Sequence, residues 1–334
     1  MGLAELPRLA ALITRLARFP RGGGPDPRVA ERRGLSGPQG IFLDEYAPRG
    51  TPAACAVLVH GMTPNGKDEP RLVHFARAAA LAGIRCTIPH LPGLAACRWE
   101  PSDLDALAAA VDDAAARGPG RPGLVGFSYG AGHALLAAAR PAAAPAVRFV
   151  LAFGACRSVH ELHDGYRAAW RAEPRNEAEW DDAIYARLVL AHRHREALGL
   201  PREARASIEE LLRRFCHAAT LGEKMAAHER HLRGLDLLGA EERAADPTAD
   251  EALSPSGKLG GLRCTVSLVH DRHDHVVPSS HSDRLFAELR ALPGGDRHRL
   301  VLTTLLQGRA GAALPPLGEL LHVFGALGPL LRAE

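Results

Sequence analysis

With 334 residues, 46% hydrophobic and 24% charged, the chain is long enough to bury a sizeable core and has an ordinary globular composition, which excludes intrinsic disorder and collagen-like repeats. The formal net charge is only +3 and the arginines are scattered, so the composition gives no argument for nucleic acid as a partner. No apolar run approaches the roughly 18 residues of a membrane span, so we expect no stable membrane insertion.

The six cysteines are dispersed through the chain without C-x-x-C spacing. Several lie in apolar, strand-like runs, where a thiol behaves as a small buried hydrophobe. This distribution predicts neither a disulfide framework nor a zinc site.

The N-terminus predicts an amphipathic helix followed by a linker. Leucines recur at helical spacing from Leu3 to Leu16, with arginines between them. Pro7 and Arg15 interrupt the apolar core that a secretory signal needs, so we expect a cytoplasmic protein. We expect the helix to dock on the protein body, with weak attachment to a membrane surface as the alternative. Residues 21–40, rich in Gly, Pro and Arg, are interpreted as the linker, so residues 1–40 precede the core.

Strand and helix patterns alternate from residue 41 to residue 153. The predicted strands are 41–46, 53–59, 84–88, 124–127 and 147–153, and the predicted helices are 71–82, 102–116 and 131–140. This order is typical of an α/β protein with a mostly parallel sheet flanked by helices and right-handed crossovers.

The alternation stops between residues 157 and 261, where helical patterns and many charges replace strand patterns. We expect this insertion to form a helical cap over the strand ends, with His192 and His194 on a solvated helix face. Strand patterns return at 263–270 and 298–306, and helices are predicted at 279–291 and 316–331. The predicted core therefore comprises residues 41–156 and 262–334, and the predicted cap comprises 157–261.

The stretch 124–130, which reads L-V-G-F-S-Y-G, carries the strongest chemical signal. It places G-x-S-x-G between a strand and a helix, which is the context of a nucleophile elbow. Because Gly126 and Gly130 lack side chains, the helix can pass close to the strand while Ser128 sits at a strained apex. Chance occurrence in a chain with 34 glycines is the alternative, and the flanking strand and helix argue against it.

Three motifs together resemble the α/β-hydrolase family. They are the elbow at Ser128, the H-G-M loop at 60–62 after an early apolar strand, and H-D-R-H-D-H-V-V-P at 270–278 after a late strand. The resemblance implies that Ser128 is the nucleophile, that Asp274 is the triad acid, and that the backbone N–H groups of Met62 and Tyr129 form the oxyanion hole. His60 is interpreted as a structural histidine. No cofactor is implied.

The expected catalytic histidine is missing from its usual place. The family order Ser, Asp, His puts the base just after the last strand, near residue 308, yet the loop Q-G-R-A-G at 307–311 contains no histidine. The next histidine is His322, which lies in the predicted final helix beside apolar residues. His322 is therefore the candidate base, and a packed helix histidine is the alternative interpretation.

The sequence predicts a serine hydrolase of esterase or thioesterase type that acts on a small-molecule ester or thioester through an acyl-enzyme on Ser128. The alternative is a catalytically degenerate binding or scaffold protein that has lost its base, and acyl transfer is a third option. The cluster from His270 to His275 could also be read as metal ligands, but alternation along an extended loop points these side chains in opposite directions. The sequence contains no motif that identifies the substrate or the oligomeric state.

Overall fold

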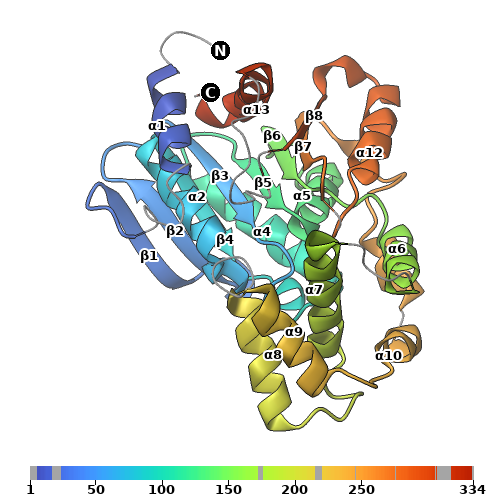
Figure 1. Cartoon of the computed structure of the whole chain (residues 1–334). Helices are drawn as coiled ribbons and strands as arrows, with labels where there is room; N and C mark the ends of the chain where they lie inside the picture. The colour runs from blue at the N-terminus through green and yellow to red at the C-terminus, as the bar shows by residue number, and fades with distance from the viewer. Residues whose placement is uncertain are drawn as a thin grey trace.

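The computed structural model describes residues 6–16, 24–171, 176–214, 220–244, 246–274, 276–304, 306 and 317–332. Its centre is an eight-stranded sheet in the order β1-β2-β4-β3-β5-β6-β7-β8 (Figure 1). The strands are β1 Val29–Ser36, β2 Phe42–Pro48, β3 Ala54–Val59, β4 Ile84–Pro89, β5 Gly123–Phe127, β6 Phe149–Phe153, β7 Thr265–Asp271 and β8 Arg299–Thr303. The pairs β1–β2 and β2–β4 are antiparallel, and every other pair is parallel.

The predicted strands from β3 to β8 all lie in this one sheet, which confirms the mostly parallel architecture. All six residues of β3 are buried, as expected for a parallel strand covered on both faces.

The prediction of a linker over residues 21–40 is wrong in part, because β1 begins at Val29. Only Val29 of this edge strand is buried. The strand therefore needs no alternation of apolar and polar residues, and its sequence has none from which it could be predicted. The strand is held instead by its antiparallel register with β2 and by an ion pair between Arg33 Nε and Asp44 Oδ2 at 2.9 Å. Both interactions involve residues of β2, which lies outside the segment 21–40, so the composition of that segment does not reveal them.

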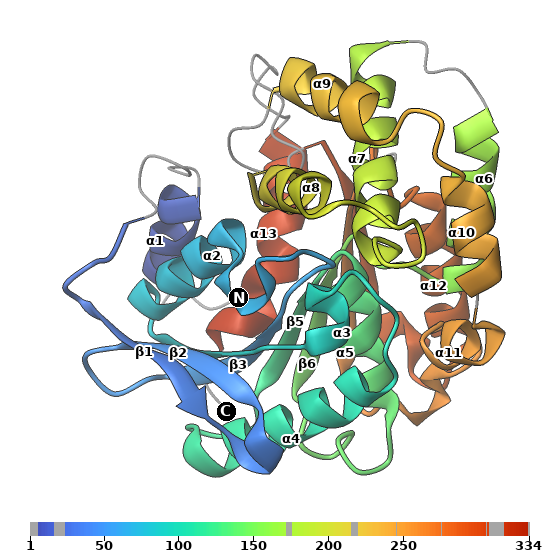
Figure 2. The same ribbon diagram turned by 90° about the horizontal axis from the view of Figure 1, so that it is seen from below.

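Helices cover both faces of the sheet. On one face lie α4 Ser102–Arg117, α5 Tyr129–Ala139 and α12 Ser280–Ala291, and on the other lie α1 Leu6–Leu16, α2 Pro70–Leu81 and α13 Leu317–Leu331. Figure 2 shows the second group on the opposite side of the sheet from α4. Alternation along β5 sends Leu124 into the first core and Val125 into the second.

The N-terminal helix α1 docks on the protein body. Its Leu9 and Leu12 are buried in the core that α2 and α13 share. Arg8 donates from Nε to the carbonyl of Ala82 at 2.7 Å and from Nη1 to the carbonyl of Leu331 at 2.5 Å. A guanidinium at the C-terminal ends of α2 and α13 satisfies carbonyls that those helices leave unpaired.

Between β6 and β7 the described chain is helical. The helices are α6 Val159–Arg171, α7 Glu177–Arg193, α8 Arg202–Arg214, α9 Leu221–His231, α10 Leu237–Ala244 and α11 Pro247–Ala252. They project from one end of the sheet (Figure 1), and α7, α8 and α9 share an apolar core of their own that includes Ile184, Leu188, Ile208 and Leu211. The helices α3 Pro92–Ala95 and α4 follow β4 on the main body.

The prediction that His192 and His194 face solvent is wrong, because both side chains are buried. They lie at the end of α7, where His194 bonds Glu241 of α10. Helix packing within the insertion, which the charge pattern does not reveal, buries this face.

The five cysteines among the described residues are buried and form no disulfide there; they are Cys55, Cys86, Cys97, Cys156 and Cys264. Within the same part of the chain, no helix is both long and apolar enough to cross a membrane.

Two histidines buried in the main body predict early acid destabilisation. Burial lowers the pKa of His60 and of His133 to about 4, from 6.5. Between pH 6.5 and pH 4 the unfolded chain therefore binds more protons than the folded chain. The contribution of these histidines to the free energy of unfolding is fully present above pH 6.5 and is lost as the pH falls towards 4. Each histidine contributes about 3 kcal/mol to this loss.

The measurement is denaturant unfolding at several pH values on the unchanged chain and on His133→Leu. The leucine fills a similar volume and removes a ring whose Nε2 has no hydrogen-bond partner among the described residues, so we expect the pH dependence to flatten by one proton. A matched control is His160→Gln, since that side chain is 73% exposed. Equal pH slopes for His133→Leu and the unchanged chain contradict the prediction.

Candidate active site

Ser128 stands at a strained turn between β5 and α5. Its φ is 53° and its ψ is −126°, a backbone conformation that residues other than glycine rarely adopt. Such strain costs about 1–3 kcal/mol and persists where the surroundings fix it. Here Ser128 N donates to the carbonyl of Phe153 at 2.6 Å, and Ala131 N donates to the carbonyl of Ser128 at 2.8 Å. The turn is therefore anchored on both sides.

Gly126 and Gly130 are required by close backbone approach. A Cβ on Gly126 would lie 2.5 Å from Ala131 Cα, and one on Gly130 would lie 2.2 Å from the carbonyl oxygen of His60. We expect Gly130→Ala to destabilise the fold by about 3 kcal/mol or more. The reason is that the atom the new methyl group meets, the carbonyl oxygen of His60, belongs to the backbone and cannot rotate away.

Denaturant unfolding tests this expectation against the control Gly165→Ala in α6. Nothing lies within 4 Å of a Cβ at Gly165, so the control is expected to stabilise the helix by about 0.5–1 kcal/mol. Two variants of equal stability argue against a steric role for Gly130.

The H-G-M loop lies directly against the elbow. A Cβ on Gly61 would lie 3.3 Å from Ser128 Cβ, and the N–H of Met62 donates to no group among the described residues. His60 is fully buried, with Leu91 N donating to its Nε2 at 3.0 Å and its Nδ1 donating to the carbonyl of Gly61 at 2.8 Å. These bonds make His60 a structural histidine that shapes the loop.

The loop after β7 holds two aspartates in different ways. Asp271 accepts from His273 N through Oδ1 and from Leu306 N through Oδ2, so both of its oxygens organise backbone. Asp274 accepts from Val276 N at 3.0 Å and Val277 N at 2.9 Å, both through Oδ1. Oδ2 of Asp274 takes no hydrogen bond from another described group. Burial raises the pKa of Asp274, although the Val277 amide favours the carboxylate.

Gly154, just after β6, is the point where the elbow and the acid loop meet. A Cβ built on Gly154 would lie 3.6 Å from Asp274 Oδ2 and 3.8 Å from Ser128 Cα. Gly154 N also donates to the carbonyl of Val269 at 2.9 Å, which ties the end of β6 to β7. The structure therefore brings Ser128, Asp274 and the Met62 loop together at one end of the sheet, beyond the carboxyl ends of the strands that precede them.

In the part of the chain that the structure describes, no histidine forms a hydrogen bond with Ser128 or with Asp274. Among the described residues, no side chain forms a hydrogen bond with Ser128 Oγ, and His322 is exposed on α13 rather than packed in its apolar face. Glu319, one turn earlier, accepts from Thr303 Oγ1 at 2.6 Å and so anchors the start of α13 to the end of β8. The loop 307–311, where the family base is expected, lies outside the described residues.

His270 cannot serve as the base in this arrangement. It is fully buried, its Nε2 donates to the carbonyl of Val277 at 2.7 Å, and its Nδ1 accepts from Ser282 Oγ at 2.6 Å. Its Nε2 lies 3.7 Å from Asp274 Oδ2, beyond hydrogen-bond distance.

The histidines and aspartates of this loop point in different directions. His270 is buried, whereas the side chain of His273 is 62% exposed. In the part of the chain that the structure describes, which omits His275, no group of three His, Cys, Asp or Glu side chains is arranged to hold a metal ion.

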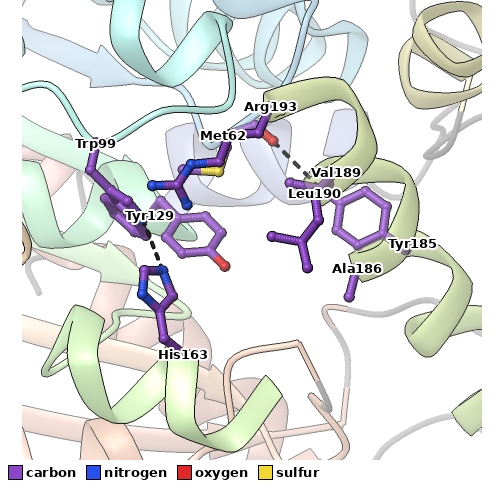
Figure 3. A pocket seen from close by; sticks show the side chains of 9 residues that line it. All are labelled: Met62, Trp99, Tyr129, His163, Tyr185, Ala186, Val189, Leu190 and Arg193. Atoms are coloured by element: carbon purple, nitrogen blue, oxygen red, sulfur yellow. Dashed lines mark hydrogen bonds between the residues drawn. The ribbon is translucent and has the colours of Figure 1, made fainter. Parts of the chain in front are cut away.

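A pocket opens between the elbow and the insertion (Figure 3). The main body contributes Met62, Trp99 and Tyr129, and the insertion contributes His163, Tyr185, Ala186, Val189, Leu190 and Arg193. Tyr129 and Trp99 meet edge to face with ring centroids 4.8 Å apart, and Trp99 Nε1 donates to His163 Nε2 at 3.1 Å. Tyr185 Oη donates to the carbonyl of Met62 at 3.4 Å, so the insertion contacts the loop beside Ser128 directly.

Sequence reasoning did not identify Trp99, His163 or Arg193 as site residues. One signal was present, since Tyr185, Val189 and Arg193 recur every four residues and share a face of α7. The pattern shows which residues share a face but not that this face lies over the elbow.

No family model matches the chain, and no curated protein matches it either. Solved structures give three likenesses of low identity. The acylaminoacyl peptidase of Pyrococcus horikoshii is 14% identical with a TM-score of 0.45, over 82% of this chain and 36% of that chain. A meta-cleavage product hydrolase from Pseudomonas fluorescens IP01 is 16% identical with a TM-score of 0.44, over 79% and 86%. A puromycin-hydrolysing peptidase of Mycobacterium tuberculosis is 18% identical with a TM-score of 0.44, over 84% and 36%.

The chain spans about a third of the length of either peptidase. Three features of the molecule define its fold: the strand order, the parallel pairings from β4 to β8, and the strained serine between β5 and α5. On these grounds, the chain has the α/β-hydrolase fold.

Proposed function

We propose that the protein is a serine hydrolase that cleaves a small-molecule ester or thioester through an acyl-enzyme on Ser128. The observation that carries this proposal is that three groups meet at one end of the sheet: the strained Ser128, Asp274 Oδ2, and a Met62 N–H that has no acceptor among the described residues. A backbone conformation that costs energy at a serine is typical of a nucleophile held ready for attack.

In the proposed reaction Ser128 Oγ attacks the substrate carbonyl and loses its proton to a base. The developing oxyanion is stabilised by the backbone N–H groups of Met62 and Tyr129. The leaving alcohol or thiol takes the proton, and water then releases the acyl group by the same steps in reverse roles. Asp274 Oδ2 is the atom that orients and stabilises the base. No cofactor is part of this proposal.

His322 is the base in this proposal. Its helix is anchored at the end of β8 through Glu319, and its exposed ring is open to proton exchange. Among the described residues His322 has no hydrogen bond to Ser128 or Asp274, so this role requires its ring to approach the elbow when substrate binds.

The second candidate is a binding protein that has lost its base. The observations that favour it are the loop 307–311 without histidine and the exposed position of His322. Such a protein keeps the pocket and the elbow but reacts slowly at Ser128.

Two variants, His322→Ala and Gly308→His, separate the candidates. With p-nitrophenyl acetate as substrate, the hydrolase proposal predicts that His322→Ala lowers kcat by about 10²-fold or more, because the serine loses its general base. Gly308→His is then expected to bring little gain. If His322→Ala changes nothing and Gly308→His raises turnover, the base has been lost and the binding-protein candidate is preferred.

A further inference from the structure

The charged side chain in the pocket beneath α7 suggests what the substrate carries. We propose that Arg193 binds the carboxylate of a short, acidic acyl group whose ester carbonyl lies at Ser128. This inference deepens the proposed function, on which it rests, by naming a substrate class.

Arg193 is held in the pocket with donors to spare. Its side chain is 13% exposed, and a single nitrogen, Nη1, donates to Glu241 Oε1 at 3.1 Å. A guanidinium has five N–H donors. Glu241 therefore leaves donors over, and none of the Arg193 nitrogens is fully buried without a partner among the described residues, so a ligand can reach them. Figure 3 shows the guanidinium directed into the space beside Met62 and Tyr129.

Glu241 orients the guanidinium without satisfying it. Its Oε2 bonds His194, and its Oε1 bonds Arg193 and lies 3.5 Å from His163 Nε2, so the carboxylate is shared among three side chains. Although burial alone raises the pKa of Glu241, the hydrogen bond from His194 and the charge of Arg193 hold it at about 2. Glu241 is therefore ionised at neutral pH and holds Arg193 through one hydrogen bond, although Glu241 itself is not part of the pocket lining.

The rest of the pocket favours a small anionic ligand. Its lining includes Arg193 but, among the described residues, no Asp or Glu. Glu241 Oε1 and Asp250 Oδ2 lie behind this lining, 3.5 Å from His163 Nε2 and 3.4 Å from His163 Nδ1. The rings of Trp99, Tyr129 and Tyr185 form apolar walls. Such walls lower the local dielectric and strengthen a guanidinium–carboxylate pair.

The position of the pocket assigns the acid to the acyl side of the ester. Tyr129 follows Ser128 directly, and Met62 follows the glycine that touches the elbow. A ligand with its carbonyl at Ser128 and its chain over Tyr129 therefore carries its far end towards Arg193.

Binding of two matched esters tests the inference. Monomethyl glutarate carries a carboxylate and dimethyl glutarate does not. Their dissociation constants are measured by calorimetry on Ser128→Ala, which cannot form an acyl-enzyme. We expect the monomethyl ester to bind about tenfold more tightly or better, as a charge-assisted hydrogen bond provides.

Arg193→Gln is expected to remove this preference, and Arg233→Gln, at a side chain 79% exposed, is expected to keep it. Equal affinities for the two esters, or a preference that survives Arg193→Gln, overturn the inference. If Arg193→Gln does not fold, the ester pair on the chain with Arg193 decides alone. Because these measurements need no catalysis, an inert Ser128 defeats the proposed function and leaves the binding result intact.

Discussion

Replacing Ser128 by alanine is expected to lower kcat/KM for p-nitrophenyl acetate by about 10³-fold or more. In the proposed mechanism the Ser128 hydroxyl oxygen forms the covalent bond with the substrate, and removing such a nucleophile leaves only the oxyanion hole and substrate binding to promote attack by water. Steady-state hydrolysis followed at the nitrophenolate absorbance gives the measurement.

The Ser128→Ala variant keeps the strained turn, since alanine at a φ of 53° is no more restricted than serine. Its unfolding midpoint should therefore match that of the unchanged chain. Ser102→Ala, at an exposed serine that begins α4, is the matched control and should retain full activity. Activity that survives in Ser128→Ala places the chemistry elsewhere.

Asp274→Asn is expected to lower kcat by about 10²–10⁴-fold with little change in KM. Its Oδ1 accepts the amides of Val276 and Val277, and an asparagine oxygen can keep those bonds. The amide NH₂ group then replaces Oδ2, so the variant keeps the loop but loses the charge that, in the proposed mechanism, stabilises the protonated base.

Asp283→Asn, at an exposed aspartate in α12, is the control for charge removal. The decisive comparison is the ratio of kcat values for the two variants, with unfolding midpoints measured beside them. Equal kcat values for Asp274→Asn and Asp283→Asn remove Asp274 from the proposed triad.

The sequence reveals most of the sheet because buried parallel strands appear as apolar runs. β3 and β5 could be located in this way, and the glycines around Ser128 predicted the close approach of backbone that the structure contains. The edge strand β1 could not be found, because its stability comes from pairing with β2 and from ion pairs rather than from an apolar pattern.

The site was predictable only where it lies in short motifs. Ser128, Met62 and Asp274 each follow a strand end, and parallel strands bring such ends together. The pocket was not predictable, because Trp99 and His163 are joined across 64 residues of chain and Arg193 reaches the elbow only through packing of α7. The burial of His194 against Glu241 has the same cause.

The central claim, that Ser128 is an activated nucleophile, is tested most directly by labelling with a fluorophosphonate probe followed by peptide mapping. The account predicts one adduct per chain, located on Ser128, absent in Ser128→Ala and formed more slowly in Asp274→Asn. A folded chain that takes no label at Ser128, or takes it at another serine, contradicts the account.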